Sequence, residues 1–448
     1  MQSRWSRRRL SRWMLALLAL TATQACMRPG TATKALCGRA SVLLLTIDSL
    51  RPDHLSTYGY GRDTSPQLTA LARDGVMFRN AFAAASWTSP ALVSLFSAHF
   101  PFGHGVIARD RSALPLLSTP LKAARAVGYR VPDLFHFQGI PDYRNLGFEP
   151  MVGAKADIAA LLRWIESAQS EPFLVVYHLR KVHLPYNPPP PYDAYFTAQV
   201  AQSGGSALSG GVEAVRSRVR VFKGSVAFDA GDRPLVVALY DGAVRAQDEE
   251  LGLILHRLKA LGRYDDLLIV VTADHGEELF DHGFVGHPST SLDGTLYDEV
   301  LRIPLVIKFP GERFAGHVID TPVRSVDVLP TVLDALGIAS PSDCDGHSLL
   351  PLIRGRAGRS PGPVLAETSV CGYVCPADAQ PRYLRAIRDE RYKLIEEADG
   401  GRVMYRLFDL LRDPAEREDI ANCNADLVER MRVLLPVSES PVRRPAGR

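Results

Sequence analysis

Ser41-Val-Leu-Leu-Leu-Thr-Ile47 is a continuous apolar run that ends in Asp48. A second run, Leu267-Leu-Ile-Val-Val-Thr272, leads into Ala273-Asp274-His275-Gly276, and Phe173-Leu-Val-Val-Tyr-His178 is a third. Such runs are typical of strands buried on both faces, as in parallel sheets. Helical patterns alternate with them, so we expect an α/β fold whose large, mostly parallel sheet is flanked by helices. The helical patterns cover residues 65–74, 116–127 and 242–261.

The sequence on either side of these runs predicts the domain organisation. We expect the large α/β domain to span residues 41–350, with a Pro/Gly-rich excursion over 185–235. The excursion is either a lid near a site entrance or a variable surface loop. Short strand patterns at 385–388, 392–396 and 407–410 and a helical pattern at 427–435 predict a small C-terminal α+β domain over 355–437, before a tail at 438–448.

Composition and charge exclude several classes of protein. The chain has 448 residues, of which 46% are hydrophobic and 23% charged, and these values exclude a mainly disordered, collagen-like or multi-span membrane protein. The net charge is 52 − 49 = +3, but the first 25 residues hold five Arg and no acidic residue. Without them the balance is 47 − 49 = −2, so we expect no nucleic-acid partner.

Residues 1–26 have the build of an export signal, with a basic stretch, an apolar run from Trp13 to about Ala22 and then small residues. The basic stretch also resembles a twin-arginine signal. Cys26 stands where a bacterial lipoprotein carries its lipid, and cleavage near Ala25 is the alternative. We expect an exported protein of the bacterial periplasm or envelope, and the only membrane contact that the sequence offers is a lipid anchor at Cys26, if that residue is lipidated rather than removed from the mature protein's N-terminus. Residues 27–40 would form a tether.

The other cysteines, Cys37, Cys344, Cys371, Cys375 and Cys423, allow disulfides in an exported protein, but their pairing does not follow from the sequence.

The two aspartates that follow buried strands predict a cation site. Ligands of parallel sheets bind at the carboxyl ends of strands. A divalent cation is the simplest partner for Asp48, with a helix N-cap or a salt bridge to Arg51 as alternatives. Asp274 and His275 can reach the same ion, and a carboxylate with an imidazole suits Mn, Zn, Mg or Ca.

Thr88 and several histidines are candidates for the chemistry itself. Ser89-Pro90 predicts a helix start, which places Thr88 at a helix N-terminus, where anionic groups are favoured. The Thr88 hydroxyl is a nucleophile or an ordinary cap. His183, just past the third strand, and His287, on the loop after Asp274, are placed to bind oxyanion charge or protonate a leaving oxygen.

For other histidines the sequence favours structural roles or leaves the role open. His178 reads as a core residue and His282 as a loop residue without a role. His104 is structural or catalytic with equal weight.

Many segments, in order, resemble the sulfatase family of the alkaline phosphatase superfamily. The resemblance runs from about Val42 to Ile420 and includes Ile47–Leu55, the Thr88/Pro90 segment, Asp274–Glu277 and Asp327–Thr331. It implies a large metal-bearing α/β domain followed by a small C-terminal sheet with a helix. It places Asp48, Asp274 and His275 on metal-ligand positions, Thr88 on the nucleophile position and His183 on an oxyanion contact. We expect Thr88 to be a metal ligand as well. His287 and His136 fall near substrate-binding lysine positions, and we also expect His104 and Lys181 to contact substrate.

Two departures from the family pattern change the expected chemistry. Sulfatases carry Cys or Ser in Cys/Ser-x-Pro-x-Arg, which is converted to formylglycine, whereas this chain has Thr88-Ser-Pro90-Ala-Leu92. We therefore expect one divalent metal ion and no formylglycine. Ser49 stands where many sulfatases have a second carboxylate. The remaining set resembles the one-metal site of lipoteichoic acid synthases and phosphoethanolamine transferases, which use a threonine nucleophile on phospho-substrates.

Three functions remain open at this point. The first is a metal-dependent hydrolase or transferase that acts on the phosphate ester of a small molecule, glycan or lipid through Thr88. The second is a true sulfuric ester hydrolase. The third is a catalytically silent exported protein that binds glycans or anionic polymers. Metal content separates the third from the others.

Overall fold

The computed structural model of the chain describes residues 35–107, 112–114, 117–135, 142–151, 157–168, 171–202, 209–356, 362–370, 372 and 382–436. The predicted leader with Cys26, the 438–448 tail, His136, Cys371 and Cys375 lie outside these ranges. Within them, no helix combines the length and apolar character needed to cross a membrane.

A seven-stranded sheet forms the centre of the large domain, in the order β3-β1-β4-β7-β2-β8, with β9 also paired to β2. β7 is antiparallel to both of its neighbours, while the other described pairs are parallel, so the mostly parallel sheet is confirmed. The strands are β1 (Val42–Ile47), β2 (Val76–Phe82), β3 (Leu174–Leu179), β4 (Leu268–Ala273), β7 (Arg302–Lys308), β8 (His317–Ile319) and β9 (Val323–Arg324).

The three apolar runs of the sequence are the strands β1, β3 and β4. Every residue of β1 and β4 is buried, because helices cover both faces of the sheet. Ile47 pairs with Ala273 of β4 and with Leu179 of β3. This register brings the residues that follow the three strands to one edge of the sheet, which positions the candidate site.

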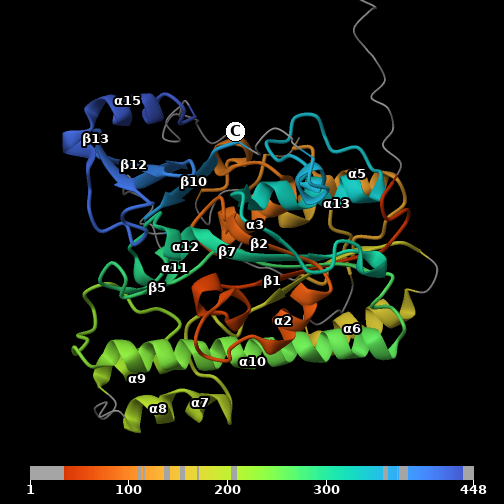
Figure 1. The fold of residues 1–448 in the computed structure, drawn as a ribbon, viewed down its shortest axis with the longest axis horizontal. Helices are drawn as coiled ribbons and strands as arrows, with labels where there is room; N and C mark the ends of the chain where they lie inside the picture. Colours follow the sequence, from red (N-terminus) through yellow and green to blue (C-terminus); the bar gives the residue numbers. More distant parts are fainter. Residues whose placement is uncertain are drawn as a thin grey trace, which may run out of the picture.

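Helices form a layer on each side of this sheet (Figure 1). One layer holds α2 (Pro66–Arg73), α6 (Ile158–Ser167) and the long α10 (Asp232–Ala260), and the other holds α3 (Thr88–Ser97), α5 (Pro120–Ala126) and α13 (Val328–Leu336). α10 starts ten residues before the predicted 242. α5 starts four residues after the predicted 116, at Pro120, where the Thr119 hydroxyl accepts the Lys122 N–H at 3.2 Å.

The 185–235 excursion contains α7 (Tyr192–Tyr195), α8 (Thr197–Gln202) and α9 (Gly210–Ser217), which lie along α10 on the side away from the sheet (Figure 1). The segment after α9 then bonds to α11 (Pro288–Ser291). The N–H groups of Val221 and Lys223 donate to the carbonyls of Thr290 and Ser291 at 3.0 and 2.8 Å. The excursion is therefore fastened to the helix that follows His287; its action as a lid stays a prediction.

The C-terminal part is a four-stranded antiparallel sheet with a closing helix, as expected. Its strands, in sheet order, are β10 (Val364–Ser369), β11 (Tyr383–Arg388), β12 (Tyr392–Asp399) and β13 (Arg402–Asp409), and its helix is α15 (Ala425–Arg432). Buried Lys393 of β12 links the C-terminal domain to the large domain. Its Nζ lies 2.9 Å from Asp298 of the large domain and 2.8 Å from Glu416 of the C-terminal domain.

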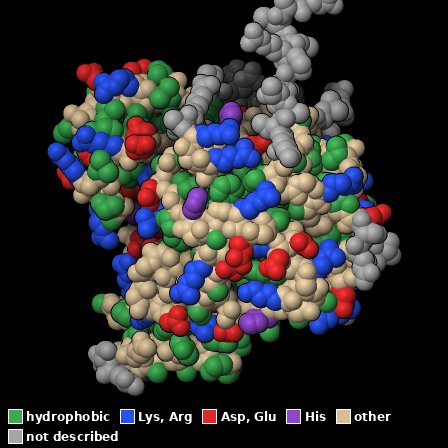
Figure 2. Space-filling view, turned by 45° about the vertical axis from the view of Figure 1, so that its right-hand side comes forward, with side chains coloured by type: hydrophobic (Ala, Val, Ile, Leu, Met, Phe, Trp, Pro, Cys, Tyr) green, Lys and Arg blue, Asp and Glu red, His purple; other side chains and the backbone are tan. Residues whose placement is uncertain are grey.

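Shorter elements complete the described chain: β5 (Glu278–Leu279), β6 (Val285–Gly286), α4 (Pro101–His104), α12 (Asp298–Leu301), α14 (Leu350–Ile353), η1 (Pro52–His54), η2 (Ser56–Tyr58), η3 (Tyr143–Leu146), η4 (Pro310–Glu312), η5 (Ser325–Asp327) and η7 (Ala421–Cys423). On the face shown in Figure 2, acidic and basic side chains are interspersed, in keeping with the small net charge.

Candidate active site

Two buried carboxylates lie side by side at the carboxyl edge of the sheet. Asp48 follows β1 and Asp274 follows β4, and the two are 0% and 2% exposed. Oδ1 of Asp274 accepts the backbone N–H groups of Ser49 and His275 at 3.2 and 2.9 Å. Its Oδ2 is buried and has no partner among the described residues. An unpaired buried carboxylate oxygen is costly, so this one indicates a place for a cation.

The electrostatics of the pair support the same interpretation. Burial alone would raise the pKa of Asp48, but the neighbouring imidazoles, His183 foremost, hold it well below its usual value. Burial, together with the negative charge of Asp48, raises the pKa of Asp274 well above its usual value. Two adjacent carboxylates resist ionising together unless positive charge is added between them.

His275 completes a donor set that fits a divalent cation. Its Nδ1 lies 2.7 Å from the Gly276 carbonyl, and because a carbonyl only accepts, Nδ1 carries the proton. The lone pair on Nε2 then points to Asp274 Oδ2 at 3.4 Å and Asp48 Oδ1 at 3.7 Å. Burial, with His287 nearby, lowers the pKa of His275 to about 3, so the ring is neutral as a metal ligand requires.

Thr88 faces this cluster from the N-terminus of α3. Its Oγ1 lies 3.2 Å from His275 Nε2, and the residue is only 4% exposed. α3 begins at Thr88 itself, with Trp87 as the residue before the helix, so Pro90 stands at the third helical position rather than the predicted first. The first N–H groups of a helix lack intrahelical partners and carry partial positive charge, which favours an anionic group beside Thr88.

Two predicted histidines and one glutamate border the cluster. The His287 ring lies 4.5 Å from the His275 ring and 5.0 Å from the His183 ring, measured between centroids. His287 Nδ1 lies 2.8 Å from Glu277 Oε1, while its Nε2 is buried without a partner in the described structure. Burial, then His183, lowers the pKa of His287 to about 3, and burial raises that of Glu277 to about 7.

The site also contains residues that the sequence interpretation missed. His178, assigned to the core, directs Nε2 to Asp48 Oδ2 at 3.3 Å and Nδ1 to Thr46 Oγ1 at 2.8 Å. Arg180 places Nε 3.5 Å from the same Asp48 oxygen, although its side chain is 61% exposed. The sequence signal that could have identified Arg180 is its position one residue past β3, at the edge of the sheet where the two aspartates lie. Arg180 is therefore an accessible cation at the rim of the cluster.

The predicted alternative of a salt bridge between Asp48 and Arg51 is wrong. Arg51 does not pair with it, because its guanidinium bonds to Asp53 at 2.7 Å and to Asp281 at 2.5 Å.

His104, His282 and Lys181 have partners of their own outside this cluster. His104 is fully buried, and its nitrogens meet Ser94 Oγ at 2.9 Å and the Val106 N–H at 3.1 Å, which favours its structural role. Lys181 pairs with Glu250 of α10 at 2.7 Å. His282 contacts Glu299 and stacks on Tyr297, away from the cluster. His136 lies outside the described residues.

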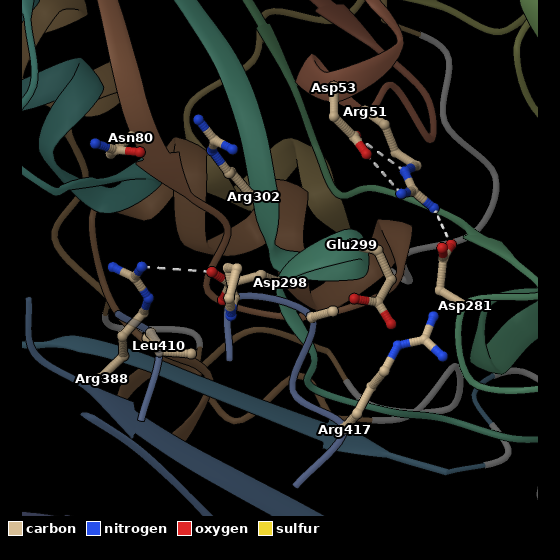
Figure 3. A pocket seen from close by; sticks show the side chains of 12 residues that line it. Arg51, Asp53, Asn80, Asp281, Asp298, Glu299, Arg302, Arg388, Leu410 and Arg417 are labelled. Atoms are coloured by element: carbon tan, nitrogen blue, oxygen red, sulfur yellow. Dashed lines mark hydrogen bonds and ion pairs between the residues drawn. The ribbon is translucent and has the colours of Figure 1, made fainter. Parts of the chain in front are cut away.

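Two cavities flank the loop between Asp274 and His287. One of about 380 Å³ lies between the domains, and Figure 3 shows side chains of both domains facing one another across it. Its residues Arg51 and Asp281 connect it to the site, since Arg51 also donates to the Glu277 carbonyl at 2.9 Å. The other, of about 430 Å³, lies between residues 221–233 and 280–285 and is rich in phenylalanine.

Comparison with known proteins identifies the family to which this fold belongs. The model of the family described as Sulfatase matches residues 40–159 and 155–338. The chain belongs to the sulfatase family. A second model, described as N-sulphoglucosamine sulphohydrolase, C-terminal, matches residues 293–435. As a family member, the protein is a hydrolase that acts on ester bonds.

Individual relatives of this sulfatase-family chain include proteins named for phosphorus and for sulfur chemistry. It is 27% identical over 406 residues to the multifunctional alkaline phosphatase superfamily protein PehA of Trinickia caryophylli, covering 70% of this chain and 77% of that protein. It is 24% identical over 426 residues to the ulvan-active sulfatase of Formosa agariphila, covering 85% and 77%. The fold resembles the crystal structure of the phosphonate monoester hydrolase of Agrobacterium radiobacter, with a TM-score of 0.69 at 23% identity over 88% of this chain and 95% of that one.

The departures from the family pattern have definite places in the structure. Leu92 is fully buried in the core beneath α3, so no guanidinium reaches the site from that position. Ser49 adopts a left-handed backbone conformation with φ 60° and donates its hydroxyl to Asp48 Oδ1 at 3.2 Å. The end of β1 therefore carries one carboxylate and one hydroxyl that is bonded to it.

Proposed function

We propose that this chain cleaves phosphate-type esters, as a hydrolase or a transferase, with Thr88 as the nucleophile and one divalent cation. The observation that carries the proposal is the position of Thr88 Oγ1, 3.2 Å from His275 Nε2 at the start of α3. A hydroxyl placed between a helix N-terminus and a carboxylate–imidazole cluster is arranged for nucleophilic attack on an anionic ester.

The residues of the cluster have separate proposed roles in binding the cation and in binding the ester. Asp48, Asp274 and His275 would hold the cation. His178, whose nitrogen lies within 4.8 Å of an oxygen of each aspartate, would orient Asp48 beside the same ion. The bound cation would supply Lewis-acid polarisation of the ester and help to ionise a nearby hydroxyl. The first N–H groups of α3 and the rim cation Arg180 would bind the non-bridging oxygens of the ester.

His183 and His287 are proposed to serve the leaving oxygen. The unprotonated Nε2 of His287 takes the Thr88 hydroxyl proton as Oγ1 attacks phosphorus. The bond to the leaving oxygen then breaks, and the same proton passes to that oxygen as it departs. Glu277 orients His287 through Nδ1, which leaves Nε2 facing the histidine cluster. Water or an acceptor alcohol then attacks the phosphothreonine and releases Thr88, which returns the enzyme to its starting state.

The residue types favour phosphate over sulfate esters. A formylglycine hydrate can expel sulfate by elimination, whereas threonine has no such route, and the family arginine is replaced by buried Leu92. Phosphothreonine is instead resolved by attack at phosphorus. A true sulfuric ester hydrolase is the second candidate, because one relative is named an ulvan-active sulfatase and the chain belongs to the sulfatase family.

Substrate and location are also proposals. The leader predicts export to the bacterial periplasm or envelope, with Cys26 as an optional lipid anchor. An exported enzyme of this class would meet small-molecule, glycan or lipid esters there. Comparing the fractionation of the wild type with that of Cys26→Ser tests the anchor, because only the wild type should remain with the membrane.

Activity of the reconstituted protein tests the proposal. Metal-stripped protein is reloaded with Mn, Zn, Mg or Ca and offered para-nitrophenyl sulfate, phosphate monoester and phosphodiester. We expect Thr88→Ala to lower turnover of the phospho-substrate about 10³-fold or more, and Thr88→Ser, which keeps a hydroxyl, to retain far more activity. A phosphorylated Thr88 peptide after acid quench would identify the intermediate.

Other results would redirect the assignment. Sulfate turnover that survives Thr88→Ala would overturn the threonine mechanism and support the second candidate. A protein that neither binds a cation nor turns over any of these esters would support a silent binding role.

A further inference from the structure

A second group of metal-ligating residues lies at the opposite end of α3 from Thr88. His99 follows the helix, and Asp343 and Cys344 lie on the loop before α14. One ligand atom from each of the three lies within 4.8 Å of the others. Because α3 has ten residues, this group is roughly 15 Å along the helix from the active site. The proposed reaction does not use it.

The imidazole of His99 is oriented as a ligand. The residue is 5% exposed, and its Nδ1 lies 3.5 Å from Asp345 Oδ2. Its Nε2 is buried and has no hydrogen-bond partner within the described part of the chain. Metal-binding histidines commonly direct one nitrogen to a carboxylate and the other to the metal, and His99 has this arrangement, with Asp345 on one side of the ring and the Cys344 thiol on the other. Asp345 and Cys344 raise the pKa of His99 to about 10, so a bound ion would replace the proton that the ring carries.

Backbone bonds hold the loop and the helix end together. The N–H groups of Asp345 and Gly346 both donate to the Ala98 carbonyl at 3.0 Å, and Asp345 Oδ2 also accepts the Phe100 N–H at 2.9 Å. Cys344 Sγ lies 3.7 Å from the Ser97 carbonyl as a free thiol. The donor atoms are therefore brought together by structure that does not depend on a metal.

We propose that His99, Asp343 and Cys344 bind a divalent transition-metal ion, with zinc the best fit. One nitrogen, one sulfur and one oxygen donor suit zinc and exclude Mg and Ca as preferred ions. Ligand atoms around tetrahedral zinc lie roughly 3.3–3.8 Å apart, so a closure of about 1 Å completes the site. Asp343 is exposed, which leaves a path for entry and a fourth position for water. The ion would fasten the helix that carries Thr88 to the 343–346 loop.

Thiol protection in the full-length wild-type protein tests this directly. Metal-stripped protein, with and without added zinc, is treated with iodoacetamide, and modification of Cys344 is measured by peptide mass spectrometry. We expect zinc to slow alkylation of Cys344 at least tenfold. Exposed Cys423 serves as the internal control and should react equally in both samples. Equal alkylation of Cys344 with and without zinc would overturn the proposal.

Cobalt substitution and metal counting separate this site from the active site. With Co²⁺, we expect a near-ultraviolet thiolate-to-cobalt band in the wild type and in Asp274→Asn, but not in Cys344→Ser or His99→Gln. The zinc content of Cys344→Ser should fall by one ion per chain, whereas the matched variant Cys423→Ser should keep it. A thiolate band that persists in Cys344→Ser, or zinc content that Cys344→Ser leaves unchanged, would refute the assignment whatever becomes of the Thr88 mechanism.

Discussion

Asp274→Asn is expected to stabilise the metal-free protein while abolishing its stabilisation by manganese. Asp48 and Asp274 are both almost fully buried, and their carboxylate oxygens lie within 4.8 Å of each other. Asparagine keeps an oxygen that accepts the N–H groups of Ser49 and His275, and it places an amide where the unpartnered Oδ2 now lies. The substitution therefore removes charge repulsion without removing the two hydrogen bonds.

The size of the effect follows from the separation of the two charges. Two unit charges at 4.8 Å in an effective dielectric constant of 20 repel by about 3.5 kcal/mol. If relaxation absorbs half of this energy, metal-free Asp274→Asn gains roughly 1.5–2 kcal/mol at pH 8. A cation at one hundred times its Kd stabilises the wild type by about 2.7 kcal/mol, so saturating metal should reverse the order of stability.

Thermal unfolding with and without Mn measures both effects, because Mn prefers carboxylate ligands and is a poor fit to the proposed thiolate site at Cys344. We expect Asp274→Asn to melt a few degrees above the wild type in chelator and below it in saturating metal. Asp266→Asn is the matched control, because Asp266 is exposed before the same strand and its substitution should change stability by less than about 0.5 kcal/mol. A metal-free Asp274→Asn that melts below the wild type, or gains as much from metal, would refute the charge argument.

Three further substitutions test the leaving-group histidine and the domain interface. His287→Gln should lower kcat roughly 10²–10³-fold on alkyl phosphate esters and less on para-nitrophenyl esters; an equal loss on both would remove the acid role. Lys393→Met leaves Asp298 and Glu416 without their cation and should lower the free energy of unfolding in urea by about 3–5 kcal/mol. A decrease of less than about 1 kcal/mol would contradict this. Burial alone would lower the pKa of His282, but its carboxylate partners raise it to about 10. The stability lost in His282→Gln should therefore be largest below about pH 6.5 and vanish as the pH rises through 10; a constant loss would count against the charged ring.

The sequence predicted the part of the fold that depends on local pattern. Strands β1, β3 and β4 lie within one residue of the apolar runs, because a strand buried on both faces needs apolar residues throughout. Their shared edge also placed Asp48 beside Asp274. The apolar pattern did not predict β2 and β7, because Arg79 and Asn80 interrupt the first and Pro304 the second.

The structure explains how such residues fit into central strands. The pairing of β2 with β7 shifts between Phe78 and Ala81, so Arg79 and Asn80 lie opposite Pro304 as a bulge. Proline has no N–H to give, and the bulge falls where that bond is missing. This compensation joins strands more than 220 residues apart in sequence, so no local pattern contains it.

His178 shows the same limit within the site. Its apolar neighbours in β3 made it read as a core residue, and alternation along a strand does not tell which face holds the charged groups. Pairing with Thr46 of β1 sets the orientation of the His178 ring, because the Thr46 hydroxyl contacts Nδ1 and Nε2 then faces Asp48. A residue that is buried beside a carboxylate differs from a core residue only through this tertiary contact.

The donor set also bears on the choice of cation. A calcium site takes six to eight oxygen ligands, and many sulfatases supply a second carboxylate at the position of Ser49. Here that position holds a hydroxyl already engaged with Asp48, while His275 directs a neutral nitrogen at both carboxylates. Two carboxylates and one imidazole match the charge and the mixed donors that Zn or Mn prefers better than those of Ca. Serine at position 49 and threonine at position 88 are thus consistent with one another under the proposed function, since both fit a small cation beside an unmodified hydroxyl.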